Sequence, residues 1–264
     1  MIHDRLVNSM RQDWDERARK DAFYYIASWR KDWNEESFLQ SGEDDYERLV
    51  AAILERHAPP SHGVMLELGC GAGRMTRSFA RRFERVIAFD ISSEMLERAK
   101  VLHAGIDNIT WTQGNGVDLS GIPSASAGFL FSYLMLQHLP NQALVSAYIG
   151  EILRVLVDNG VCLFQFNGTA EKNMNWKGRT VWGLVDLLRT LQLNRACRSA
   201  AKMLGLDPEM AGKTWHGVGV ESKRIAEAVG RSGGRVLELL GAETPMAWCC
   251  ARKIGFMKET TRNP

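Results

Sequence analysis

The stretch of the chain with the clearest chemical meaning is residues 64–74, which read Val-Met-Leu-Glu-Leu-Gly-Cys-Gly-Ala-Gly-Arg. One carboxylate, that of Glu67, lies in an apolar run that leads into glycines at three alternate positions. Because glycine has no Cβ, a ligand can approach its backbone closely. A carboxylate in an apolar strand needs a hydrogen-bonding or charged partner, which a ligand or a loop amide could provide. The pattern therefore predicts a ligand site where this strand ends.

The glycine spacing separates this turn from the common phosphate-binding loops. The dinucleotide pattern G-x-G-x-x-G, counted from Gly69, needs a glycine at the position that Arg74 occupies. The pattern G-x-x-x-x-G-K-[ST] does not occur in this stretch either. The spacing thus disfavours a nicotinamide-dependent oxidoreductase.

The elements that must hold this turn alternate between strands and helices. Apolar runs predict strands at residues 64–68, 86–90, 109–113, 128–135, 161–166, 235–240 and 246–252. Helices are expected at residues 74–83, 93–103, 142–156 and 221–232. Continuously apolar strands that alternate with helices indicate a parallel sheet covered on both faces. Only about five residues separate the last two strands, too few for a parallel crossover, so the sheet should finish with an antiparallel hairpin strand.

Two segments fall outside this alternation. Residues 1–60 are expected to form a helical segment rich in aromatic side chains, with Pro59-Pro60 at its end. Residues 169–216 are expected to form a helical insertion, which leaves residues 61–168 and 217–264 as the main domain. The first segment could be a cap over a bound ligand or a packed helix pair. The insertion could be a lid over an apolar pocket or a subunit contact.

Beyond the glycine turn, several segments occur in an order that resembles the class I S-adenosylmethionine-dependent methyltransferases. Residues 67–73 are similar to motif I of that family. Residues 90–96, Asp-Ile-Ser-Ser-Glu-Met-Leu, are similar to its step after the second strand, and residues 114–119 to its turn after the third. The resemblance covers about residues 60–168 and 217–253. It implies an α/β fold with a Rossmann-like, seven-stranded, mostly parallel sheet, and S-adenosyl-L-methionine as the cofactor.

The resemblance also implies which residues bind the cofactor. They are Glu67, Gly69, Cys70, Gly71, Gly73, Asp90, Ile91, Met95, Asn115 and Gly116. Three further candidates come from their position in the chain: Trp14 and Tyr25 would contact the cofactor if the N-terminal segment is a cap, and Gln137 could hydrogen-bond the cofactor or the acceptor, with packing as the alternative role. Asp90, at a strand end, can accept hydrogen bonds from both ribose hydroxyls. Asn115 stands where the family commonly has an aspartate, and its amide oxygen can still accept from the adenine amino group.

Methyl transfer from a sulfonium requires an aligned nucleophile and, for many acceptors, removal of a proton. His138 and His216 are candidate bases, since a histidine with an ordinary pKa near ~6.5 can take a proton at neutral pH. Tyr133 could hydrogen-bond the acceptor. For each of these residues, packing is the alternative role. No metal site is expected, because the five cysteines are scattered and form no C-x-x-C pair.

Composition limits the partners. The chain has 33 basic and 31 acidic residues, for a net charge of +2, so it lacks the basic excess of a nucleic-acid-binding surface. It has no apolar run of about 18 residues, and no signal peptide is evident, so we expect a cytoplasmic protein that does not enter a membrane.

The leading hypothesis is a methyltransferase that acts on an oxygen or nitrogen of a small-molecule acceptor. A homodimer is compatible with this hypothesis. The alternatives are an RNA or protein methyltransferase and a domain that binds S-adenosylmethionine without catalysis.

Overall fold

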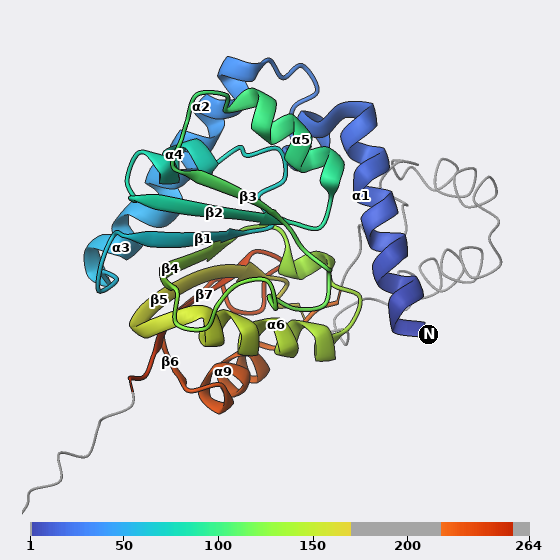
Figure 1. Ribbon diagram of the computed structural model, residues 1–264. Helices are drawn as coiled ribbons and strands as arrows, with labels where there is room; N and C mark the ends of the chain where they lie inside the picture. Colours follow the sequence, from blue (N-terminus) through green and yellow to red (C-terminus); the bar gives the residue numbers. More distant parts are fainter. Residues whose placement is uncertain (1, 170–217, 256–264) are drawn as a thin grey trace, which may run out of the picture.

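The computed structural model describes residues 2–169 and 218–255. The predicted insertion at 169–216 and the candidate base His216 lie outside these residues, apart from Thr169. Seven strands form one sheet: β1 (Val64–Leu68), β2 (Arg85–Asp90), β3 (Ile109–Gln113), β4 (Ala127–Ser132), β5 (Leu156–Phe166), β6 (Gly234–Leu240) and β7 (Ala247–Lys253). Their order is β3-β2-β1-β4-β5-β7-β6 (Figure 1). The first five strands are parallel, and β7 pairs antiparallel with both β5 and β6. The predicted α/β fold with a mostly parallel sheet and an antiparallel hairpin is confirmed.

The strand order reverses between β1 and β4, since β2 and β3 extend the sheet to one side and β5 to the other. In open α/β sheets such a reversal leaves a crevice at the carboxyl ends of the two central strands. The glycine turn follows β1 directly, so the fold places it at this crevice.

The helices occupy both faces of the sheet and the end where the parallel strands finish. They are α1 (Ile2–Ile26), α2 (Glu35–Tyr46), the π-helical turn η1 (Glu47–Ala51), α3 (Ala52–Arg56), α4 (Thr76–Ala80), α5 (Ser93–Leu102), the 3-10 turn η2 (Leu136–His138), α6 (Gln142–Val155) and α9 (Ser222–Arg231). Side chains of α6 and α9 share a buried cluster with one face of the sheet. Those of η1, α3 and α4 share a cluster with the opposite face. None of the described helices is long and apolar enough to cross a bilayer.

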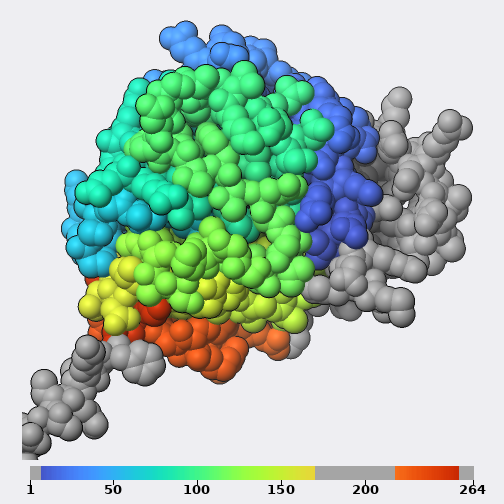
Figure 2. Space-filling view, viewed as in Figure 1, coloured from blue at the N-terminus to red at the C-terminus, as the bar shows by residue number. Residues whose placement is uncertain are grey.

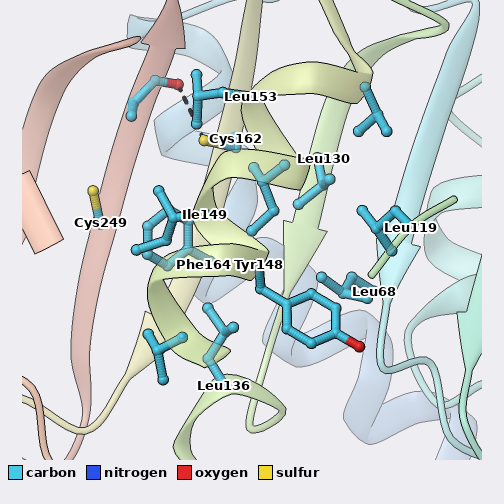
Figure 3. Close-up of a cluster of buried hydrophobic side chains, with 14 of the residues drawn as sticks. Leu68, Leu119, Leu130, Leu136, Tyr148, Ile149, Leu153, Cys162, Phe164 and Cys249 are labelled. Atoms are coloured by element: carbon cyan, nitrogen blue, oxygen red, sulfur yellow. Dashed lines mark hydrogen bonds between the residues drawn. The ribbon is translucent and has the colours of Figure 1, made fainter. Parts of the chain in front are cut away.

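The larger core cluster shows how α6 is held on the sheet. Figure 3 shows Tyr148 and Ile149 of α6 facing Leu68, Leu130 and Phe164, which come from β1, β4 and β5. All five side chains are at most 2% exposed. Apolar burial of this kind is the main favourable contribution to folding.

Some element boundaries differ from the sequence prediction. The helix expected at residues 74–83 begins only at Thr76, and β4 ends at Ser132 rather than at residue 135. Residues 133–135 instead form a turn in which Leu134 has a positive φ of 58°. As a result, Tyr133 lies beyond the strand, in the loop that leads to His138.

The N-terminal helix α1 crosses the sheet end where the parallel strands finish (Figure 1). Its residue Asp21 has extended φ and ψ angles of −165° and 89°, and this breaks the helix near its end. The Asp21 side chain accepts a hydrogen bond from the Tyr24 N–H (3.0 Å), so it caps the last helical turns. In the space-filling view, the dark blue surface of α1 lies directly against the green middle of the chain (Figure 2).

Polar contacts of Asp15 and Arg11 hold α1 in this position. Asp15 accepts a hydrogen bond from the Ser92 hydroxyl (2.6 Å) at the start of α5. Arg11 donates to the carbonyl oxygens of Gly114 and Asn115 (3.4 Å each). Asp15 therefore places a negative charge at the N-terminus of α5, where the helix dipole favours it.

The four described cysteines, Cys70, Cys162, Cys249 and Cys250, are buried free thiols. Burial raises the pKa of the Cys70 thiol well above its ordinary value, so this residue of the glycine turn stays protonated. A structural role for these cysteines agrees with their burial, whereas Cys197 lies outside the described residues.

The core predicts a measurable cost of truncation at Ile149. We expect Ile149→Ala to lower the free energy of unfolding by about 2–5 kcal/mol, because it leaves a cavity against β5. Urea unfolding followed by circular dichroism measures this. Val101→Ala is the control, because Val101 is 77% exposed on α5 and its truncation should change stability by at most about 0.5 kcal/mol. Equal effects of the two substitutions would contradict the described core.

Candidate functional site

A cavity opens at the carboxyl ends of β1, β2 and β4, next to α1. Most of the residues that the sequence singled out line it. They are Trp14, Tyr25, Glu67, Gly69, Cys70, Gly71, Asp90, Ile91, Met95, Gly116, Tyr133, Gln137 and His138. The fold thus brings together residues from five separate parts of the chain, as a ligand site at the strand reversal requires.

Asp90 joins two walls of the cavity. One carboxylate oxygen accepts a hydrogen bond from the Gly71 N–H (2.8 Å), and the other accepts one from the Ser92 N–H (2.9 Å). Burial raises the pKa of Asp90 above its ordinary value, although these N–H donors act in the opposite direction. Each oxygen keeps a second lone pair, so the carboxylate can still accept hydrogen bonds from the hydroxyls of a ligand.

Glu67 lies on the same wall but is 5% exposed. It points to the face of the sheet that carries α4, where the Thr76 hydroxyl donates to its Oε2 (2.5 Å). Burial raises the pKa of Glu67 to about 8, partly offset by the Thr76 hydrogen bond and the charge of Arg74. The carboxyl therefore holds its proton at neutral pH, and a cation in the cavity would favour its ionised form.

His138 lies in η2, and its ring meets the Trp14 ring edge-on at a centroid distance of 5.4 Å. The Gln137 side-chain nitrogen lies 3.3 Å from His138 Nε2, while the Gln137 oxygen accepts from the Gln165 amide (3.1 Å). An amide nitrogen only donates, so His138 Nε2 is the acceptor in this contact. The pair Gln137–Gln165 thus orients the imidazole with a basic nitrogen at Nε2. The catalytic role of His138 remains a prediction.

Tyr133 is partly buried, and its ring packs against Trp248 at a centroid distance of 5.1 Å. Burial raises the pKa of its phenol, which therefore keeps its proton at neutral pH. Tyr133 can donate a hydrogen bond to a ligand but is a poor base.

Two residues from the sequence prediction lie outside the cavity wall formed by the described residues. A Cβ on Gly73 would come within 2.5 Å of the His103 ring. The glycine is therefore needed for close packing of His103 and not for the approach of a ligand. The buried His103 ring contacts the Gly73 carbonyl oxygen through Nε2 (2.9 Å), and burial lowers its pKa to about 4. The Asn115 amide is used within its own loop, where its oxygen accepts from the N–H groups of Val117 and Asp118.

Several residues that the sequence analysis did not select also line the cavity, among them Met10, Trp29, Arg74, Met135 and Tyr148. The sequence contained a signal for two of them, Met10 and Arg74. Met10 precedes Trp14 by one helical turn and so shares its face. Arg74 was noticed only because it breaks the dinucleotide pattern. Tyr148 belongs to the apolar stripe of α6 and resembles a core residue in sequence.

The residues that line the cavity fit an adenosine-containing sulfonium cofactor. Apolar side chains of Met10, Ile91 and Met95 line the same cavity as Asp90, which suits an adenine ring beside a ribose. The carboxyl of Glu67 suits the ammonium of an amino-acid group, because a nearby cation favours its ionised form. The described residues contain no group of three or more His, Cys, Asp or Glu side chains placed to hold a metal ion.

Comparisons with known proteins agree with this geometry. Residues 66–164 match the sequence model of the methyltransferase domain family. The chain is 30% identical to a trans-aconitate 2-methyltransferase of Methylobacterium radiotolerans over 51% of this chain and 49% of that protein. It is 34% identical to the enzyme of the same name from Deinococcus radiodurans, over 40% and 38% of the two chains. The matched region thus spans about half or less of these curated relatives.

Among solved structures, an S-adenosylmethionine-dependent methyltransferase from Mesorhizobium loti has the same fold. The TM-score is 0.53 at 17% identity, and the likeness covers 76% of this chain and 96% of that one. At this identity the likeness concerns the fold alone.

The buried carboxyl of Glu67 predicts a pH-dependent stability. The pKa of Glu67 is about 8 in the folded protein, against an ordinary value of 4.5. The neutral carboxyl therefore contributes fully to the free energy of unfolding below pH 4.5, and this stabilisation is lost as the pH rises through 8. Glu67→Gln cannot ionise and avoids this loss, so its stability relative to the unmodified protein should rise with pH, by on the order of 3–5 kcal/mol between pH 5 and pH 8.5. Urea unfolding at pH 5, 7 and 8.5 measures the difference.

Glu84→Gln is the control, because Glu84 is exposed and lies outside the cavity wall. Its effect on the free energy of unfolding should change little with pH. A pH-independent difference for Glu67→Gln would show that Glu67 is ionised in the folded protein.

Proposed function

We propose that this chain is a class I S-adenosylmethionine-dependent methyltransferase that transfers a methyl group to an oxygen or nitrogen of a small acceptor. The observation that carries the proposal is the cavity at the strand reversal, where Asp90 holds the glycine turn and faces an apolar wall. The match of residues 66–164 to the methyltransferase domain family covers β1, β2 and β4, which form that crevice.

Several described residues would bind the cofactor. Asp90 would accept hydrogen bonds from the ribose hydroxyls, while Ile91 and Met95 would pack on the adenine ring. When bound, S-adenosylmethionine supplies an electrophilic methyl group on a sulfonium sulfur. Glu67 would face the positively charged part of this ligand, which favours ionisation of its carboxyl.

The N-terminal helix α1 would act as the cap that excludes water. Its residues Met10, Trp14 and Tyr25 line the cavity, and Asp15 ties it to the start of α5. Closure over the site would strengthen the electrostatic interactions inside, because water no longer screens them. This arrangement favours the cap over a helix pair that merely packs on the sheet edge.

A small acceptor is favoured by three observations. The cavity lies partly under α1 rather than on an open face. The net charge of +2 offers little attraction to a nucleic acid. The two bacterial relatives are named for trans-aconitate, a small polycarboxylic acid, so acids of this class are the first acceptors to assay.

His138 would take the proton that an acceptor hydroxyl or amine loses. Its Nε2 lone pair now accepts from Gln137, and an acceptor group that replaced this contact would find an oriented base. A carboxylate acceptor has no proton to lose at neutral pH, so in that case alignment alone would suffice.

Cofactor binding predicts a thermal shift. S-adenosylhomocysteine, the demethylated product, should raise the melting temperature, and NAD should not, because binding to the folded state stabilises it by mass action. Asp90→Asn should weaken S-adenosylhomocysteine binding by about tenfold or more, since a charged hydrogen-bond acceptor is lost. Asp107→Asn, at an exposed position, is the control. Undiminished binding by Asp90→Asn would refute the ribose assignment.

The activity of His138→Gln depends on the acceptor. For a hydroxyl or amine acceptor we expect turnover to fall by ~10²-fold, the usual contribution of a general base. For a carboxylate acceptor it should stay within about threefold, because no proton is removed in the reaction. An assay with methyl-labelled cofactor, with trans-aconitate and with a metabolite extract, measures both. The exposed His62→Gln is the control, and full activity of His138→Gln on a hydroxyl or amine acceptor would exclude the base role.

A further inference from the structure

The cavity wall contains a buried guanidinium, that of Arg74, which the proposed reaction has not used. Arg74 is 4% exposed and lies 5.3 Å from the Trp29 ring centroid and 5.8 Å from that of Tyr133. All three residues line the cavity. A buried arginine is stable only with compensating charge and hydrogen bonds, so its partners show what holds it there.

The partners of Arg74 come from α2. Its Nη2 forms an ion pair with Asp45 Oδ2 (2.7 Å), and its Nη1 donates to the Ser41 carbonyl oxygen (3.0 Å). Asp45 is itself buried, with 8% exposure. A guanidinium has five N–H donors in a planar fork, so these contacts leave N–H groups for a ligand.

The local sequence of α2 explains why the pair can form. A side chain at Gly42 would overlap the Arg74 carbonyl oxygen, so only glycine lets the helix approach the loop after β1 so closely. Asp45 follows Gly42 by three residues and therefore lies on the same side of α2. The helix thus presents one carboxylate to the single arginine of the glycine turn.

Asp45 also extends the network to Tyr133. It accepts from Arg48 Nη2 (2.5 Å), and the Arg48 side chain reaches the Tyr133 hydroxyl. Arg48 belongs to the π-helical turn η1, and such turns often occur at functional sites. One buried carboxylate therefore contacts two arginines that meet cavity-lining side chains.

We propose that Arg74 binds the carboxylate of the cofactor's amino-acid group, and that Asp45 is a positioning residue that holds Arg74 for this purpose. The inference rests on the proposed function. The charge of Arg74 lowers the pKa of Glu67, so a guanidinium cation and a carboxyl group lie near each other on the cavity lining. An α-ammonium and an α-carboxylate have the matching pair of charges, and a guanidinium fork binds a carboxylate through two hydrogen bonds.

Arg17 is the competing cation. Its guanidinium lies 4.8 Å from the Trp14 ring centroid and pairs with Asp13 (3.0 Å). The wall formed by the described residues includes Arg74 but not Arg17, and this favours Arg74.

The test compares two ligands that differ in the amino-acid group. 5′-Methylthioadenosine keeps the adenosine and the sulfur of S-adenosylhomocysteine but lacks the carboxylate and the ammonium. We expect Arg74→Lys to weaken S-adenosylhomocysteine binding by about tenfold or more, because the charge stays but the fork is lost. Binding of 5′-methylthioadenosine should change by less than about twofold, since it does not contact Arg74. Isothermal titration calorimetry gives both affinities.

Asp45→Asn should show the same selective loss, about three- to tenfold for S-adenosylhomocysteine, because it keeps the shape but releases Arg74. Asp44→Asn is the matched control, an exposed neighbour on α2 that should bind both ligands normally. A general structural defect would lower both affinities together, so the ratio of the two separates positioning from misfolding.

A ligand-side measurement does not depend on any variant. The unmodified protein should bind decarboxylated S-adenosylhomocysteine at least about tenfold more weakly than S-adenosylhomocysteine, and this ratio should fall toward one in Arg74→Lys. If the affinity ratios of Arg74→Lys and Asp45→Asn both equal those of the unmodified protein, the inference is overturned while the proposed function stays intact. A selective loss in Arg17→Lys instead of Arg74→Lys would overturn it as well. Failure of the unmodified protein to bind either nucleoside would refute the proposed function and the inference together.

Discussion

The carboxylate of Asp90 accepts one hydrogen bond from the turn after β1 and another from the start of α5, and the rest of the site depends on this pair. The two N–H groups belong to Gly71 and Ser92, nineteen and two residues away in the chain. Ser92 in turn caps α5 through the Met95 N–H (3.1 Å) and donates its hydroxyl to Asp15 of α1. The glycine turn, α5 and the N-terminal helix α1 are therefore aligned through one strand-end carboxylate.

This arrangement concentrates negative charge at one part of the cavity. Asp15 lies close enough to raise the pKa of Asp90, and both acids are stabilised by N–H groups at the start of α5. Elsewhere on the wall, Glu67 lies near the positive charge of Arg74. These groups would orient a ligand that carries a ribose and an amino-acid group, because each part of the ligand meets a group of complementary character.

The sequence predicted the features of the fold and of the site that depend on local residue pattern. The apolar runs of β1 and β2, the glycine turn between β1 and α4, and the carboxylate at the end of β2 all follow from residue type and spacing. The short link between β6 and β7 also predicted their antiparallel pairing. What it could not predict depends on contacts between distant residues. Gly73 resembles a ligand-binding glycine until the fold brings His103 against it. Arg74 gains a partner only because Gly42 lets α2 approach.

The position of β7 also could not be read from the link length, which fixes the pairing direction but not the side on which the hairpin joins the sheet. β7 lies between β5 and β6, although it follows both in the chain. During synthesis, β5 and β6 must therefore emerge before the strand that joins them, and each leaves an unpaired edge until β7 is available. Open strand edges favour pairing with other chains. A chain that lacked β7 would therefore leave the edge of β5 unpaired and β6 detached from the sheet, two open edges that favour association between chains.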